Sequence, residues 1–129
     1  MKIVPNDPKD IETIKRELKI NLTNGNVIGY HCDKGTGLFA LVNYYKDLDI
    51  ELHVFGSGLW ATKEIFKHLF THIFHEDLLN CKRCSAKIWS KNHKCIKLVE
   101  RLGFVKEGEL RGLDTNLYSL LKEDCTWVA

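Results

Sequence analysis

The stretch WSKNHKCIKLVERLGFVKEG, residues 89–108, contains the transition that decides the fold. Asn92 follows a strand-like run, and Asn is among the most favourable residues for capping the start of a helix. Gly103 closes the segment, as expected for the C-terminal end of a helix. The apolar residues between them have helical spacing: Ile96, Val99 and Leu102. The stretch therefore predicts a strand, a helix over residues 93–102, and a return to extended chain.

The residues before this stretch predict a parallel crossover. Asp49 to Phe55 has the pattern of a strand, and Gly56-Ser57-Gly58 is expected to break it. From about Leu59 the apolar period changes from two to 3.6, which predicts a long helix through His75. Cys84 to Trp89 is then a second strand, parallel to the first, because a helical crossover joins the two.

The rest of the chain adds antiparallel strands and one more helix. The expected elements are an edge strand at 2–4, a helix at 7–21, and strands at 27–32, 38–45, 104–107 and 117–121. The resulting order is β-α-β-β-β-α-β-α-β-β. This order predicts a mixed α/β sheet of about six to seven strands with helices on both faces.

Length and composition limit the class of protein. The 129 residues are enough for one domain, expected over 1–129, with 44% hydrophobic and 28% charged residues. No apolar segment is long enough to span a membrane and no secretory signal is present, so a cytoplasmic location and no membrane partner are expected. The five cysteines are an odd number, which favours free thiols over a disulfide framework.

Charge is concentrated in one region of the sequence. Residues 82–106 contain eight basic side chains and one acidic one, Glu100. This imbalance indicates a phosphate-bearing partner, either a nucleotide cofactor or a nucleic acid. An ordinary solvated basic face is the alternative interpretation.

The motifs of the second half resemble a known family. Asn92, Gly103-Phe104 and Glu107-Gly108 with Arg111 are similar to motifs of the GNAT superfamily of N-acetyltransferases, nearest to the ribosomal-protein N-terminal acetyltransferase branch. The resemblance covers roughly residues 27–121 and includes short phage and prokaryotic members. It implies the GNAT acyl-CoA N-acyltransferase fold. It also implies acetyl-CoA as co-substrate and direct acetyl transfer to a primary amine on a protein, peptide or small molecule.

The resemblance also implies a cofactor site. A glycine-containing loop before a helix offers unpaired N–H groups and the positive end of the helix dipole to a pyrophosphate. The residues in that position are Val54, Gly56, Ser57, Gly58, Leu59, Trp60, Ala61 and Thr62. Leu59 stands where the family has a glycine, and no basic residue leads the loop. Asn92 would contact the pantetheine arm or cap its helix. Three lysines, Lys91, Lys94 and Lys97, would meet the 3′-phosphate of CoA or be solvated.

Two residues are candidates for the proton transfer that amine acetylation requires. Glu51 and His53 lie two apart on the predicted strand and so share one face. By the resemblance, Glu51 is the first choice of base and His53 the second, while the main chain near Val54 would polarise the thioester carbonyl. Val99 occupies the position of the family's usual tyrosine acid. The tyrosines that could replace it are Tyr30, Tyr44, Tyr45 and Tyr118.

Other functions stay open from the sequence. A non-catalytic binding or structural protein with the GNAT fold is the main alternative, and a nucleic-acid-binding basic domain is the third. Cys81 and Cys84 form a C-x₂-C pair, and His68, His72 and His75 recur on one helix, but neither set has the spacing of a complete metal site. The apolar strand 117–121 could pair across a homodimer.

Overall fold

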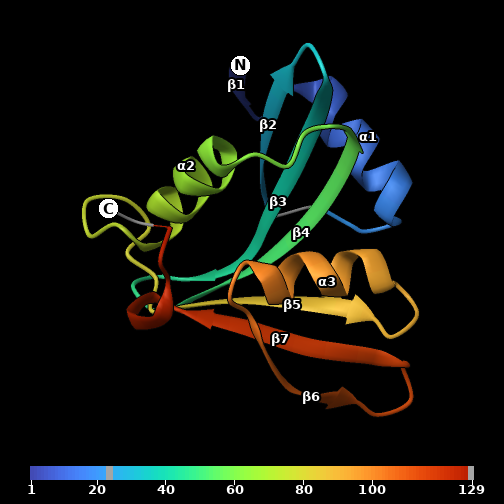
Figure 1. Cartoon of the computed structure of the whole chain (residues 1–129), viewed down its shortest axis with the longest axis vertical. Helices are drawn as coiled ribbons and strands as arrows, with labels where there is room; N and C mark the ends of the chain where they lie inside the picture. Colours follow the sequence, from blue (N-terminus) through green and yellow to red (C-terminus); the bar gives the residue numbers. More distant parts are fainter. Residues whose placement is uncertain (23–24, 128–129) are drawn as a thin grey trace.

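The computed structural model describes residues 1–22 and 25–127. Within these residues it contains seven strands, three α-helices and a short 3₁₀ helix (Figure 1). In chain order they are β1 (Lys2–Pro5), α1 (Pro8–Leu18), β2 (Asn26–Cys32), β3 (Gly35–Tyr45), β4 (Asp49–Gly58), α2 (Lys63–Phe74), β5 (Arg83–Trp89), α3 (His93–Arg101), β6 (Val105–Leu110), β7 (Thr115–Leu121) and η1 (Lys122–Asp124). The element order and mixed sheet predicted from the sequence are confirmed.

All seven strands form one sheet in the order β1-β2-β3-β4-β5-β7-β6. Every neighbouring pair is antiparallel except β4 and β5, which run parallel. Helix α2 carries the chain from the end of β4 back toward the level at which β4 began. β5 can therefore run beside β4 in the same direction, which is the parallel pairing that a helical crossover produces.

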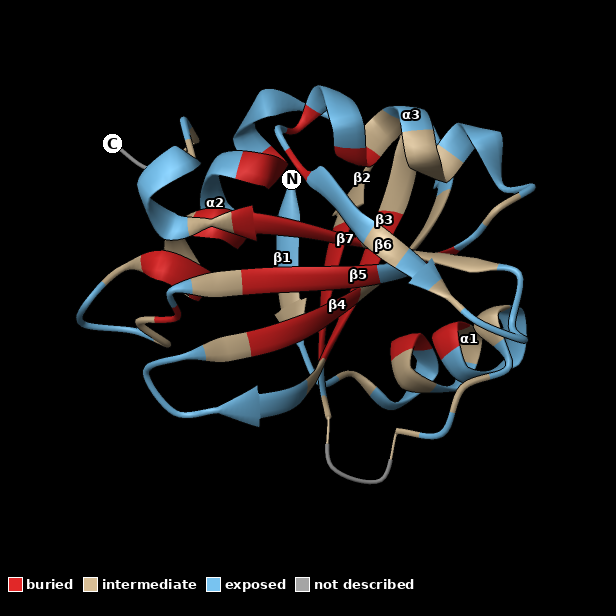
Figure 2. Ribbon diagram, turned by 90° about the horizontal axis from the view of Figure 1, so that it is seen from below, coloured by how far each residue is buried: buried red, intermediate tan, exposed pale blue. Residues whose placement is uncertain are grey.

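Helices cover both faces of the sheet (Figure 2). On one face α1 packs on a small core that includes Ile14, Val27, Leu38 and Ala40. On the other face α2 and α3 cover a larger core, in which the buried face of α2 meets alternate residues of β2 to β5. The strand period of two separates these cores, since Phe39 and Ala40 point to opposite faces.

The parallel pairing of β4 and β5 is short. It contains only three residue pairs, Asp49 with Arg83, Ile50 with Cys84, and Glu51 with Ser85. Beyond these pairs the strands diverge from a common end (Figure 1). Each keeps its outer partner, because β4 stays paired with β3 as far as Gly58 and β5 stays paired with β7 as far as Trp89.

Beyond their three paired residues, β4 and β5 are separated by a gap. One arginine connects β4, β5 and β6 at the paired end, where the gap is closed. Arg83 on β5 places Nη1 3.1 Å from Asp49 Oδ1 on β4. The same guanidinium donates from Nε and Nη2 to both carboxylate oxygens of Glu107 on β6, at 3.2 and 2.8 Å. Planar two-point contacts of this kind fix geometry as well as charge. Glu107, which the sequence singled out as part of a motif, thus has a structural partner.

The expectation that Gly56-Ser57-Gly58 breaks the strand is wrong. β4 continues through all three residues, which pair with Gly37, Thr36 and Gly35 of β3. Helix α2 begins at Lys63, capped by the Thr62 hydroxyl, and not near Leu59. The reason is long-range: the β3 partner strand supplies hydrogen bonds that local glycine propensity does not predict.

Two glycines in the paired strands β3 and β4, Gly37 and Gly56, leave the space that Trp60 occupies. Its indole is 9% exposed and contacts Phe39 and Phe66 edge-on, with ring centroids 5.6 and 5.8 Å away. A Cβ built at Gly56 would overlap the indole nitrogen, and one at Gly37 would lie 2.6 Å from Cε3. The glycines are therefore required for space, because any side chain there would displace the indole.

We expect Gly56→Ala to destabilise the protein by about 1–3 kcal/mol, because the new methyl group overpacks the Trp60 site. Gly108→Ala on β6 is the matched control, since a Cβ there meets nothing within 4 Å. Its expected effect is within about 0.5 kcal/mol. Urea unfolding of both variants measures the difference, and equal stabilities would contradict the steric role of Gly56.

Candidate functional site

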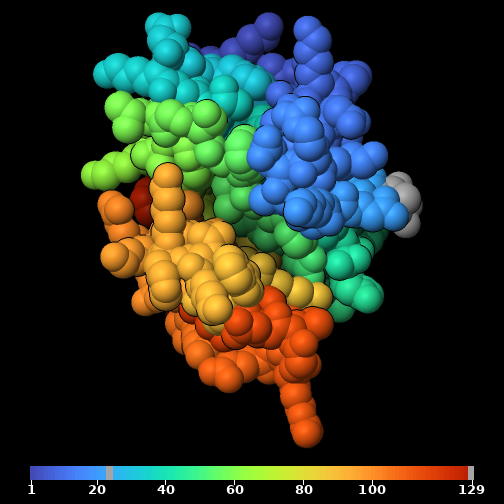
Figure 3. All heavy atoms as spheres, turned by 90° about the vertical axis from the view of Figure 1, so that its right-hand side faces the viewer, coloured from blue at the N-terminus to red at the C-terminus, as the bar shows by residue number. Residues whose placement is uncertain are grey.

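A pocket of about 790 Å³ opens beside the gap between β4 and β5. It lies among four parts of the chain: the end of α1, the β2–β3 turn, the segment from the end of β4 to α2, and α3 with the residue before it. Seen from the side, the surface is recessed where these parts meet (Figure 3). We call this the first pocket.

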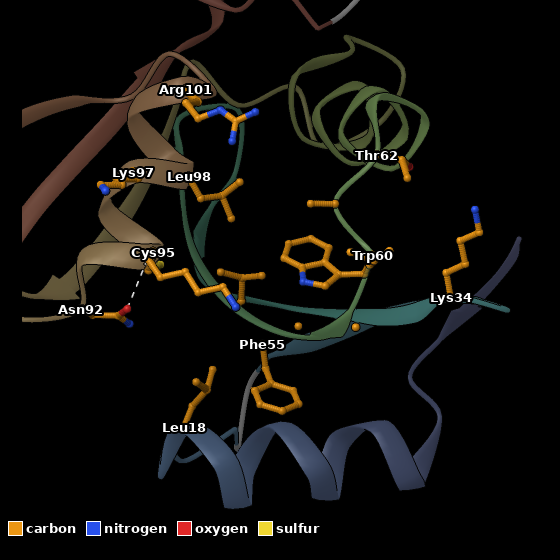
Figure 4. A pocket seen from close by; sticks show the side chains of 16 residues that line it. Leu18, Lys34, Phe55, Trp60, Thr62, Asn92, Cys95, Lys97, Leu98 and Arg101 are labelled. Atoms are coloured by element: carbon orange, nitrogen blue, oxygen red, sulfur yellow. Dashed lines mark hydrogen bonds between the residues drawn. The ribbon is translucent and has the colours of Figure 1, made fainter.

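The floor of the first pocket is formed by the segment that joins β4 to α2. Its lining includes most of the residues predicted for the cofactor: Val54, Gly56, Gly58, Leu59, Trp60, Ala61, Thr62, Asn92 and Lys94. Ser57 is the predicted cofactor residue that does not line it. The Trp60 indole projects into the middle of the view, above Phe55 (Figure 4).

Several main-chain N–H groups near this floor have no internal partner. The Leu59 N–H donates to the carbonyl of Lys34 and is therefore not available. The Thr62 hydroxyl accepts the N–H of Ile65. Within residues 1–22 and 25–127, the N–H groups of residues 60–64 have no hydrogen bond, and they lie at the positive end of the α2 dipole. The arrangement suits an anionic group.

Positive side chains surround the same pocket. Its basic lining residues are Lys34, Lys94, Lys97 and Arg101, and no aspartate or glutamate lines it among the described residues. Lys94, Lys97 and Arg101 follow the helical spacing i, i+3, i+7, which puts them on one side of α3. Four cations with no lining acid make the pocket a focus of positive potential.

Asn92 has the capping role that the sequence allowed. Its side-chain Oδ1 accepts the N–H of Cys95 at 3.2 Å, at the start of α3. Its side chain also lines the first pocket and lies toward its edge (Figure 4). The amide nitrogen makes no hydrogen bond in the described part of the chain, so Asn92 can cap the helix and still donate to a ligand.

A second pocket of about 400 Å³ adjoins the first and passes through the gap. Four residues line both pockets: Leu18, Val54, Asn92 and Cys95. The second pocket takes Leu52 and Ile88 from the face covered by α2 and α3, and His53 and Lys87 from the opposite face. A space lined from both faces of a sheet requires that the two strands between them have separated.

A charged cluster lies at the edge of the second pocket. His53 Nε2 is 2.7 Å from Glu51 Oε2, and Lys87 Nζ is 3.1 Å from Glu51 Oε1. Burial alone would raise the pKa of Glu51, but the hydrogen bonds and charges of His53 and Lys87 outweigh it, so this pKa lies below its usual value. Glu51 is then ionised at neutral pH. Because a carboxylate only accepts, His53 Nε2 carries the proton that joins them.

The two candidate bases thus differ in position. His53 lines the second pocket, whereas Glu51 lies behind it and lines neither pocket. Alternation along β4 places both on the sheet face that carries α1, as predicted from their spacing. In the neutral imidazole the other ring nitrogen, Nδ1, is unprotonated and can accept a proton.

None of the four tyrosines considered as acids lines either pocket. The Tyr30 hydroxyl is hydrogen-bonded to His68 Nδ1 at 2.7 Å, and burial raises its pKa. The Tyr44 hydroxyl donates to the carbonyl of Leu79. Cys95, one turn before Val99, is the side chain with an ionisable proton that lines both pockets, and burial raises the pKa of its thiol.

Sequence reasoning missed several lining residues. Lys34 comes from the β2–β3 turn and Leu18 from the end of α1, and no local signal connects either with α3. Arg101 could have been found, because it continues the spacing of Lys94 and Lys97. Lys87 could also have been found by strand alternation, since it lies two residues from Ser85, the partner of Glu51.

Comparisons with solved structures found chains of similar fold. The Campylobacter jejuni N-acetyltransferase PseH is 15% identical, with a TM-score of 0.64 over 93% of this chain and 96% of that one. A structure of PseH in complex with acetyl coenzyme A gives 0.59, at 18% identity and coverage of 90% and 82%. A mutant of the Vibrio cholerae spermidine N-acetyltransferase SpeG gives 0.63, at 17% identity and coverage of 91% and 75%.

These likenesses show the fold: the chain has the α/β fold of the GNAT N-acetyltransferases. Searches with the sequence itself found no matching family model and no significant match to a curated protein. None of the helices in the described residues has the length and apolarity needed to cross a membrane.

We expect Glu51→Gln to lower the free energy of unfolding by about 1–3 kcal/mol at pH 7, because it removes the charge held by His53 and Lys87. The folded-state pKa is depressed, so this contribution is present above the unfolded value of about 4.3 and disappears as pH falls through the folded value. Urea unfolding at pH 7 and near pH 3 measures the change.

Glu109→Gln is the matched control, because Glu109 makes only an exposed ion pair with Lys106. Its expected effect is below about 0.5 kcal/mol at both pH values. A Glu51→Gln penalty that is as large at low pH as at pH 7 would show that packing, and not charge, holds Glu51.

Proposed function

We propose that the protein is an acyltransferase that moves an acetyl group from acetyl-CoA directly to a primary amine. The observation that carries this proposal is the gap between β4 and β5, through which a positively lined pocket meets a second, largely apolar one. The fold shared with PseH and SpeG supports it. PseH binds acetyl coenzyme A in one of those structures, which supports the same co-substrate here.

In this proposal the first pocket holds the coenzyme. The N–H groups at the start of α2, with Lys34 and Arg101, would meet its phosphates, and Lys94 and Lys97 supply further positive charge. The amide nitrogen of Asn92 would donate to the pantetheine arm. The basic side chains surround a concave pocket, which favours a small phosphate-bearing ligand over a nucleic acid.

His53 is proposed as the proton acceptor and Glu51 as its positioning residue. The amine nitrogen attacks the thioester carbonyl, a C–N bond forms, and the C–S bond breaks. His53 Nδ1 takes the proton that the nitrogen loses, and that proton then passes to the leaving thiolate. Glu51 holds the Nε2–H tautomer and stabilises the imidazolium by its charge. The main-chain N–H near Val54 would polarise the carbonyl oxygen.

Binding of the coenzyme is the first test. Acetyl-CoA at a hundredfold excess over its dissociation constant should stabilise the fold by about 2.7 kcal/mol, and a melting experiment measures this. Lys94→Ala should weaken binding by about fivefold, equal to about 1 kcal/mol. Lys91→Ala is the control, because Lys91 lies over the Trp89 ring and lines neither pocket. Equal losses in both variants would contradict the assigned pocket.

Turnover is the second test. Release of free CoA in the presence of an amine should fall by about 10²–10⁴-fold in His53→Ala, with coenzyme binding retained. Glu51→Gln should lower kcat less than His53→Ala does and leave KM for acetyl-CoA unchanged, because it keeps His53 in place and removes only the carboxylate that positions its ring. Unchanged turnover in His53→Ala would reject this base.

A GNAT-fold protein that binds partners without turnover is the competing function. Retained binding of acetyl-CoA with no CoA release for any amine would favour it. Three statements stay predictions from the sequence: the similarity to the ribosomal-protein N-terminal acetyltransferase branch, the cytoplasmic location and the homodimer.

A further inference from the structure

We infer that the acceptor is a monoamine on an apolar body, and that polyamines are poor acceptors. This inference rests on the proposed function and assigns the second pocket to the acceptor. The acetyl group would arrive from the first pocket, and Val54, Asn92 and Cys95 mark the boundary that both pockets share.

The second pocket is apolar over most of its lining. Beyond the catalytic edge its apolar lining comes from β4, β5, α3 and the end of α1 with Ile20, together with Trp89 and two leucines of the β6–β7 turn region, Leu110 and Leu113. Trp89 is 55% exposed and Leu113 is 66% exposed, although both are large apolar residues. Exposed apolar side chains beside a pocket supply the contact area that an apolar ligand needs.

Among the described residues, Lys87 is the charged side chain that lines the second pocket, and it is a cation. Its ionisable lining side chains, within the described residues, are His53, Lys87 and the thiol of Cys95, and no aspartate or glutamate lines it. Glu51 behind them is not free, since its two carboxylate oxygens are taken by His53 and Lys87. Lys91, with Nζ 6.0 Å from the centre of the Trp89 ring, adds another cation beside this pocket.

This charge pattern discriminates among amines. The reacting amine must be neutral, so a monoamine brings no other charge into the site. A polyamine brings further ammonium groups, which find no carboxylate there and lie close to Lys87. A site that leaves a ligand's charge unpaired, or places it beside a charge of the same sign, binds that ligand more weakly than its competitors. SpeG, which shares the fold, is a spermidine N-acetyltransferase by name, so the fold does not decide the acceptor.

The test compares two probes of similar length, 4-phenylbutylamine and spermidine. With acetyl-CoA saturating, kcat/KM for 4-phenylbutylamine should exceed that for spermidine by at least about tenfold. Calorimetry on the CoA-loaded protein gives a second readout that needs no turnover. There too 4-phenylbutylamine should bind more tightly than spermidine.

Two variants at one exposed position isolate the charge. Leu113→Glu adds an acid to the lining, and Leu113→Gln removes the same apolar contact without adding charge. Both should lose affinity for 4-phenylbutylamine. Spermidine should gain at least about threefold in Leu113→Glu over Leu113→Gln, because a carboxylate then faces its ammonium groups.

The outcomes separate the inference from the proposed function. Spermidine that binds or reacts as well as 4-phenylbutylamine overturns the inference while leaving the acetyltransferase proposal intact. Binding of 4-phenylbutylamine without acetylation supports the ligand class assigned to the second pocket and overturns the enzymatic role. If neither amine binds to the CoA-loaded protein, the second pocket is not the acceptor site and the inference fails.

Discussion

The site depends on how short the contact between β4 and β5 is. Three residue pairs hold the strands together, and the Arg83 guanidinium ties that end to Asp49 and Glu107. Past Glu51 each strand relies on its outer neighbour for backbone hydrogen bonds. The sheet can therefore open in its centre without leaving either strand unsupported, and both pockets exist because of that opening. An arginine with two carboxylate partners resists further separation better than a lysine could.

Trp60 is the bulkiest residue of the segment between β4 and α2, and the structure accommodates it inside the fold. The indole packs against Phe39 and Phe66 and lies on the glycines of the β3–β4 ribbon. Its bulk thus belongs largely to the core, although it still forms part of the floor of the first pocket. Gly37 and Gly56 are extended residues of the paired strands that leave room for the ring. Gly58 differs, because its φ of +72° requires the backbone freedom of glycine.

The sequence predicted the order of elements because helices and strands differ in apolar period, and both periods are strong here. The α3 cap at Asn92 was predictable for the same local reason. Contacts made by distant segments were not predictable: Lys34 reaches the first pocket from another turn, and β4 extends to Gly58 only because β3 pairs with it. Spacing placed Glu51 and His53 on one face, but it could not show that their direct contact leaves His53 alone at the pocket.

The two pockets adjoin at the gap between β4 and β5, and this has a consequence for the order in which ligands bind. In the proposed function, coenzyme and acceptor occupy separate pockets that share Leu18, Val54, Asn92 and Cys95. Coenzyme and acceptor can therefore bind in either order. Each product can leave from the pocket in which its precursor was bound.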